Sequence, residues 1–225
     1  ELLSGKAIEV LYHLGEPRTV AEIAERTGNY RNTVNRELKP LLDRGIVGRD
    51  GSQYRINDEF QDVIQFVHAL VRHSHRQTMK QVAGRHRLIW TGLHSFLVET
   101  SEPVEAERFH ETGPRRLQDH GIQILATEKR YYLYDGSGAG FGPEDLLCHL
   151  LLIDRSPRFL TYALLLITKE DLDEGAVRST AERYGVTDLV DQLFTYLEQE
   201  GDGGVTKFPS WQEFQDTARE YGVTV

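Results

Sequence analysis

Apolar residues recur at the spacing of one helix face in two neighbouring stretches of the chain, 19–28 and 31–47. The first stretch begins with Thr19, a suitable N-terminal cap, and ends at Gly28, a suitable residue to close a helix. In the second stretch one face carries Val34, Leu38, Leu41, Leu42 and Ile46. The pattern predicts two short amphipathic helices joined by a tight turn, the second only mildly kinked at Pro40.

The opposite face of the second predicted helix is polar and basic, with Arg31, Asn32, Asn35, Arg36 and Lys39. Arg and Asn can form paired hydrogen bonds with guanine and adenine edges in the major groove, whereas Lys suits a phosphate better. After this helix, the segment VGRDGSQYRIN (47–57) predicts two strands around an Asp50-Gly51 turn. Arg49 and Arg55 flank that turn.

The run EIAERTGNYRNTVNRELKPLLDRGIV resembles the winged helix-turn-helix of ArsR and MarR-like regulators, over roughly residues 3–57. The resemblance implies binding to double-stranded DNA. We expect Arg31, Asn32, Asn35 and Arg36 at base edges, Tyr30, Thr33 and Lys39 at the backbone or base edges, and Arg49 and Arg55 at phosphates on the side of the wing. The alternative is a winged helix that serves protein contacts alone.

A long apolar stripe predicts a helix from Asp58 to about Gly84, without proline or internal glycine. Its apolar face needs a cover, either the rest of its own subunit or a second copy of the chain. Because helix-turn-helix regulators bind paired half-sites, we favour a homodimer. Residues 72–87 contain five basic and no acidic residues, either a phosphate-contacting surface or a solvated face. His73 and His75 would point apart, so we expect no metal site here.

The second half of the chain predicts an α+β region that is mostly helical. We expect a helix over about 88–97, a short helix ended by Gly121, a β-hairpin around Thr127-Glu128-Lys129 and a helix from Pro143. RFLTYALLLITK should be core, and three further helices follow, the last containing Trp211. The predicted domains are a DNA-binding domain over 1–57, a connecting or dimerisation helix over 58–87, and a regulatory or partner-binding domain over 88–225.

The phrases FHETGPRRL, YYLYD, PEDLLCHLLLID and FLTYALLLI resemble the C-terminal region of haloarchaeal helix-turn-helix proteins and, more distantly, AbiEi-type antitoxins. The resemblance implies a regulator. Together with the expected homodimer, it leads us to expect a transcriptional regulator that binds a pseudo-palindromic operator. The alternative that it implies is a DNA-binding antitoxin whose C-terminal domain neutralises a nucleotidyltransferase-like toxin. A third hypothesis is a small-molecule effector, which would need an apolar pocket near Tyr131, Tyr132 and Tyr134.

The charge is unevenly distributed. The chain carries −9 in all, with +3 over residues 1–87 and −12 over residues 88–225, so the basic part is the part with the DNA-binding pattern. Arginine outnumbers lysine by 20 to 6, which would suit a salt-adapted or a high-GC archaeal or bacterial source. No apolar run approaches the ~20 residues that span a bilayer, and we expect a cytoplasmic protein. Cys148 lies in the apolar run LLCHLLLI and should be a buried structural thiol.

Candidate catalytic groups are sparse. The glycine-rich segment 136–140 and the pair Asp171 and Asp173 together hint at a nucleotidyltransferase. About 35 residues separate the segment from the pair, whereas nucleotidyltransferases resemble one another in having roughly a dozen residues between the two features. A loop leaving a strand and an acidic helix start explain them better. We therefore expect no enzymatic activity, no catalytic residue, no cofactor and no metal.

Overall fold

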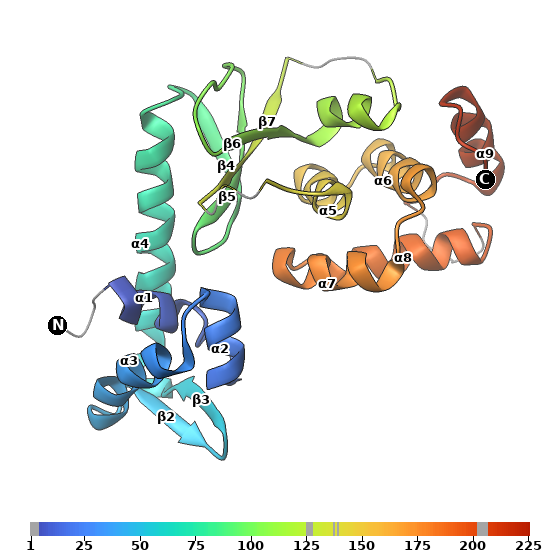
Figure 1. The fold of residues 1–225 in the computed structure, drawn as a ribbon. Coiled ribbons are helices and arrows are strands. Elements are labelled where there is room, and N and C mark those ends of the chain that lie inside the picture. Colours follow the sequence, from blue (N-terminus) through green and yellow to red (C-terminus); the bar gives the residue numbers. More distant parts are fainter. Residues whose placement is uncertain (1–4, 125–127, 137, 139, 202–206) are drawn as a thin grey trace. The chain divides into compact units, whose positions relative to one another are not determined.

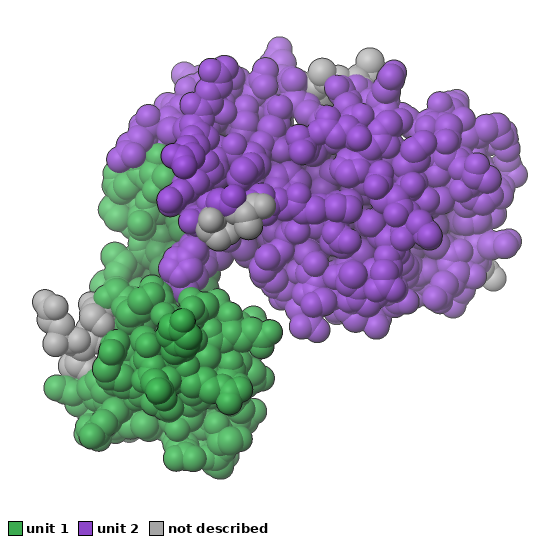
Figure 2. Space-filling view, in the orientation of Figure 1, with its two compact units in different colours: residues 1–78 green, residues 79–225 purple. Residues whose placement is uncertain are grey.

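The computed structural model describes residues 5–124, 128–136, 138, 140–201 and 207–225. The chain divides into two compact units, which we call unit 1 (residues 1–78) and unit 2 (residues 79–225; Figure 2). Helices account for 56% and strands for 15% of the described residues, and the two sheets are small and antiparallel. The α+β class predicted from the sequence is therefore confirmed.

Unit 1 places three helices around a three-stranded antiparallel sheet and ends in a long helix (Figure 1). The sheet order is β1-β3-β2. The elements are α1 (Gly5–Tyr12), β1 (Arg18–Thr19), α2 (Val20–Thr27), α3 (Arg31–Asp43), β2 (Val47–Asp50), β3 (Gln53–Ile56), the 3-10 turn η1 (Asp58–Phe60) and α4 (Gln61–Lys80).

Local contacts fix both ends of α2. The Thr19 hydroxyl accepts from the Glu22 backbone at 3.3 Å, and the Glu22 carboxylate accepts from the Thr19 backbone at 2.6 Å, which forms a capping box. Gly28 ends the helix in the left-handed region, with φ of 65°. The Asn29 amide then donates to Glu9 of α1 at 2.7 Å. This hydrogen bond connects the turn before α3 to α1.

The apolar face of α3 packs into the core of unit 1 as predicted, since Val34, Leu38 and Leu41 are buried there. The same core includes Val10, Leu11, Leu14, Ile23, Ala24, Val47, Tyr54, Ile56 and Val67. Pro40 lies inside α3, and the helix continues through it to Asp43, so the prediction that it would not break the helix is confirmed.

The long helix predicted from Asp58 is present, as η1 followed by the 20-residue α4. It buries Val67 and Val71, while Phe66 and Leu70 remain 53% and 37% exposed. These two residues are one turn apart, so they lie on the same side of α4. An apolar strip of this helix is therefore not covered by the rest of unit 1.

Unit 2 contains a four-stranded antiparallel sheet of order β4-β5-β7-β6. Its strands are β4 (His86–Thr91), β5 (Ser95–Thr100), β6 (Phe109–Thr112) and β7 (Arg130–Asp135). The predicted helix over 88–97 is wrong, because this stretch forms β4, a turn at Gly92 and the start of β5. Phe96, Leu97 and Val98 are all fully buried, and a strand covered on both faces lacks the alternation that distinguishes it from a helix.

The β-hairpin predicted around 127–129 is also wrong in its pairing. The strand after it exists, but β7 pairs with β5 and β6. Ile122 and Ile124 form no strand and are buried in the helical core instead. Thr127 of the predicted turn lies outside the described residues. Sequence pattern alone could not show that two buried isoleucines pack against helices and not beside a strand.

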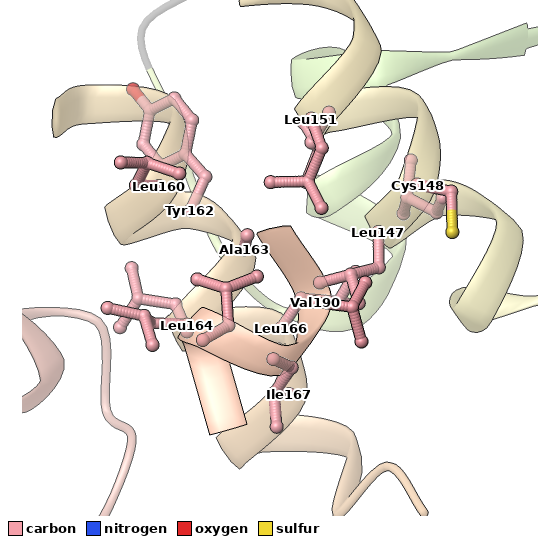
Figure 3. Packing of buried hydrophobic residues seen from close by; sticks show 14 of the residues in the cluster. Leu147, Cys148, Leu151, Leu160, Tyr162, Ala163, Leu164, Leu166, Ile167 and Val190 are labelled. Carbon is pink, nitrogen blue, oxygen red and sulfur yellow. The ribbon is translucent and has the colours of Figure 1, made fainter. Parts of the chain in front are cut away.

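The helices of unit 2 are η2 (Gly113–His120), α5 (Pro143–Ile153), α6 (Pro157–Glu170), α7 (Glu174–Tyr184), α8 (Thr187–Glu198) and α9 (Trp211–Glu220). The predicted end at Gly121 and the predicted start at Pro143 are confirmed. Apolar side chains of α5 and α6 meet each other and Val190 of α8 in the core (Figure 3). Among the described helices, none has the length and apolar character to cross a membrane.

Cys148 lies in this core as predicted and is fully buried. Burial raises the pKa of its thiol to about 12, so the sulfur stays protonated and unreactive at neutral pH.

Candidate nucleic-acid interface

The outward face of α3 carries the side chains that the sequence singled out. Tyr30 stands at the N-cap position and is 86% exposed. The side chains that are exposed along the helix are Arg31, Asn32, Asn35, Arg36 and Lys39, whereas Thr33 is half-buried. The buried face of the helix fixes its rotation about its own axis, so these groups share one solvent-facing surface.

The N-terminus of α3 is unlike that of α2. It has no side-chain cap and no acidic residue in its first turn, whereas Thr19 and Glu22 cap α2. Backbone N–H groups at such a terminus, together with the helix dipole, attract an anion. Arg31 and Asn32 stand at this terminus, so side-chain and backbone donors coincide there.

Arg36 forms an ion pair with its neighbour on α3. Its Nε donates to the adjacent Glu37 carboxylate at 3.2 Å, while the arginine side chain remains 71% exposed. An exposed ion pair contributes at most about 1 kcal/mol, so Arg36 can exchange this partner for another acceptor at small cost.

The β2–β3 hairpin places its two arginines on opposite faces. Arg49 pairs in register with Tyr54, and Arg55 pairs with Gly48. Directly paired residues share a face and successive residues alternate, so Arg49 and Arg55 point to different sides. Arg49 donates to the carbonyl of Gly51 at 2.8 Å and lies over the Tyr54 ring. The opposite orientation of the two arginines was not predicted from the sequence.

The turn of the hairpin is one residue later than the sequence suggested. Asp50 still pairs with Gln53, which leaves Gly51 and Ser52 as the two loop residues. Gly51 has φ of 55° at the first of these positions, where a type II′ turn requires glycine.

The base of the hairpin is held by residues that sequence analysis did not identify. The Asn57 amide donates to the carbonyl of Gly45 at 2.6 Å. A Cβ at Gly48 would collide with the Asn57 amide oxygen. An Asn at the end of a predicted strand gives no signal for such a role, because its partner lies in a loop 12 residues earlier.

The carboxylates considered for catalysis have structural roles. Asp171 ends α6 with a left-handed φ of 49°, and Asp173 caps α7 by accepting from the Ala176 backbone at 2.8 Å. Ser137 and Ala139 of the glycine-rich segment lie outside the described residues. Across the described residues, no three His, Cys, Asp or Glu side chains are grouped to hold a metal ion.

Comparison with known proteins places the chain in a family through unit 2. The structure defines an α+β protein with an exposed polar and basic helix in one unit and a sheet covered by helices in the other. A protein-family model described as HVO_2833_C, C-terminal, matches residues 106–223, which is more than half of the chain. The protein therefore belongs to this haloarchaeal family. No curated protein and no solved structure matches the chain.

Proposed function

We propose that the protein is a sequence-specific DNA-binding transcriptional regulator whose unit 1 is a winged helix-turn-helix. The observation that carries the proposal is the outward face of α3, which combines exposed Arg31, Asn32, Asn35 and Arg36 with an uncapped helix N-terminus. These groups are donors suited to base edges and phosphates. In this proposal α3 enters the major groove, the β2–β3 hairpin contacts phosphates beside it, and the protein acts in the archaeal cytoplasm.

The proposal includes a homodimer that binds a pseudo-palindromic operator. Its support is the strip of α4 formed by Phe66 and Leu70, which are two of the four large hydrophobic residues exposed among the described residues. Two copies of the strip packed together would remove both from water. A two-fold dimer of this kind presents two copies of α3 to two half-sites.

The proposal is tested by measuring binding of the full chain to DNA from upstream of its own coding sequence, against scrambled DNA of equal length, over a range of salt. We expect preference for the upstream DNA. Arg36→Ala should weaken binding by about 1–3 kcal/mol and relax the preference at one base pair.

Lys6→Ala is the matched control. It removes one positive charge from the same unit, on α1, where Lys6 pairs with Glu9 at 2.9 Å. This variant should bind as the parent does. Equal loss of affinity for every DNA sequence in Arg36→Ala would show that Arg36 contacts only phosphate, and no preference in the parent protein at any salt would reject the function.

The alternative function is a DNA-binding antitoxin whose unit 2 binds a nucleotidyltransferase-like toxin. This function also requires α3 to bind DNA, and in addition it requires a protein partner for unit 2. A stable complex between the full chain and the product of a neighbouring toxin-like gene, measured by size-exclusion chromatography, would favour it over regulation alone.

A further inference from the structure

Unit 2 contains a cavity of about 360 Å³ between its sheet and the helices α5 and α6. A cavity of this size is in the range of small-molecule sites. Its apolar walls come from Tyr131 of β7, Phe159 and Tyr162 of α6, and Pro114 and Ile153. The cavity therefore offers aromatic surfaces to a flat apolar group.

Three cations and two carboxylates also line the cavity. Glu99 accepts from Arg87 at 2.8 Å and from Lys129 at 3.2 Å, and the two cations lower the pKa of its carboxyl against the opposing effect of burial. Asp154 accepts from the backbone and the hydroxyl of Ser156, both at 3.0 Å. Both carboxylates thus have partners of their own.

Arg158 is the third cation of the cavity. Among the described residues, no carboxylate lies within 4.0 Å of its guanidinium. Its Nε donates to the Tyr162 hydroxyl at 2.7 Å, and its guanidinium lies over the Tyr162 ring, 5.4 Å from the centroid. These contacts fix the plane of the guanidinium and leave its two Nη groups for a ligand. Arg158 and Tyr162 also line a second cavity of about 400 Å³, next to Thr161, Thr217 and Tyr221.

The hydroxyl of Tyr131, in the same cavity, hydrogen-bonds to the Glu99 carboxylate and is not a free donor. Burial raises the pKa of Tyr131 to about 12, with the charge of Glu99 adding to the effect. The phenol therefore stays protonated at neutral pH.

We propose that this cavity binds a small organic carboxylate with a planar apolar body. The two Nη groups of Arg158 pair with the carboxylate, in the forked geometry that arginine favours, and the aromatic walls cover the body. The apolar body is required because residues 88–225 carry a net charge of −12, which opposes the binding of a bare anion. The inference concerns unit 2 alone and holds whatever α3 binds.

The test is calorimetric titration of the full chain with 2-naphthoate and with its neutral analogue 2-naphthamide, at one fixed ionic strength. We expect saturable 1:1 binding of 2-naphthoate and about tenfold weaker binding of 2-naphthamide, because a hydrogen bond to a charged group is the stronger one. Arg158→Gln should weaken the binding of 2-naphthoate by about tenfold and change the affinity for 2-naphthamide by no more than about twofold.

Two further variants separate charge from geometry. Arg158→Lys keeps the charge but loses the fork, so its affinity for 2-naphthoate should be intermediate. Tyr162→Phe keeps the ring and removes the hydroxyl that accepts from Nε of Arg158. It should therefore weaken the binding of 2-naphthoate but not of 2-naphthamide, and by a smaller factor than Arg158→Gln does.

Arg219→Gln is the control for loss of charge, since Arg219 lies on α9 with its side chain 76% exposed and pairs with Asp216. It should bind both probes as the parent does. Emission from Trp90 and Trp211, both in unit 2, shows whether each variant is folded. No saturable binding of 2-naphthoate, equal affinity for the two probes, or unchanged affinity in folded Arg158→Gln would overturn the proposal.

Discussion

The imidazole Nε2 of His149 lies 3.0 Å from the hydroxyl of Tyr184 in the core of unit 2. Tyr184 donates its own proton to Asp145 at 2.8 Å, so the hydrogen between the two rings belongs to His149. The other ring nitrogen, Nδ1, then accepts from the Thr112 hydroxyl at 2.8 Å. Asp145 also pairs with Arg183. A neutral imidazole thus has both of its nitrogens satisfied inside the core.

This neutral histidine predicts a pH dependence of stability. Burial, with a contribution from the charge of Arg183, lowers the pKa of His149 to about 3. In the unfolded chain the group would titrate near its ordinary value of about 6.5. Between these two values the unfolded state binds a proton that the folded state does not, so the free energy of unfolding falls as the pH falls, by up to about 1.4 kcal/mol per pH unit.

The measurement is denaturant unfolding between pH 7 and pH 4, followed by tryptophan emission, since Trp90 and Trp211 both report on unit 2. His149→Phe should be less stable at pH 7, by about 1–3 kcal/mol, because Thr112 loses its acceptor. The free energy of unfolding of this variant should also depend less steeply on pH, because the contribution of His149 is absent. Tyr184→Phe keeps the buried imidazole and should keep the slope. Equal slopes in the parent and in His149→Phe would refute the assignment.

A second prediction concerns the base of the β2–β3 hairpin. Gly48→Ala would place a Cβ against the amide oxygen of Asn57 and should lower the stability of unit 1 by about 1–3 kcal/mol. Asn57→Ala removes both the obstacle and the hydrogen bond to Gly45. The double variant should therefore be no less stable than Asn57→Ala alone.

Scanning calorimetry of the full chain measures these differences as shifts of the transition of unit 1. The control is Gly5→Ala in α1, where an added Cβ would meet nothing within 4 Å. Additive losses in Gly48→Ala and Asn57→Ala would show that the two residues do not interact.

Unit 1 could be predicted closely from the sequence because its signals are local. The Thr19 hydroxyl caps α2 by accepting from a residue three positions later, and Gly28 and Gly51 supply left-handed backbone conformations. The apolar spacing of α3 likewise repeats within a few residues. Unit 2 was predicted well where the same rules apply, at Gly121 and Pro143. Its sheet was not, because the pairing of β7 with β5 joins segments about 30 residues apart, and no local pattern encodes that choice.

The side chains of the candidate interface could likewise be named in advance, since exposure on α3 follows from the position of its buried face. The hypothesis of an effector site pointed to the aromatic segment of β7, and Tyr131 does line a cavity. Arg158 could not be anticipated, because it faces that cavity only through the packing of α6 against the sheet.

A third prediction separates the two arginines of the hairpin. Arg49 and Arg55 lie on opposite faces, so they cannot share one phosphate if the hairpin contacts DNA. Each of Arg49→Ala and Arg55→Ala should weaken binding on all sequences alike and reduce the slope of log affinity against log salt by about one, and the double variant by about two. Titrations in several salt concentrations measure the slope, with Lys6→Ala as the control for charge. An effect of one arginine only would mean that the hairpin lies flat on the DNA.

The last prediction concerns the exposed strip of α4. Phe66 is 53% exposed and Leu70 37%, and a surface helix that leaves two such neighbours in water gains free energy when a second copy covers them. Phe66→Ser should therefore shift the protein from dimer to monomer, as measured by light scattering across a range of concentration. Gln65→Ser alters the adjacent exposed position without removing apolar surface and should stay dimeric.

Such a monomer would also lose affinity for a two-half-site operator much more than for a single half-site, because the second contact is no longer tethered to the first. Fluorescence anisotropy with both DNA lengths measures this difference. A parent protein that is monomeric at every concentration, or a Phe66→Ser variant that remains dimeric, would exclude this strip as the dimer surface and leave α4 as a helix that serves its own subunit alone.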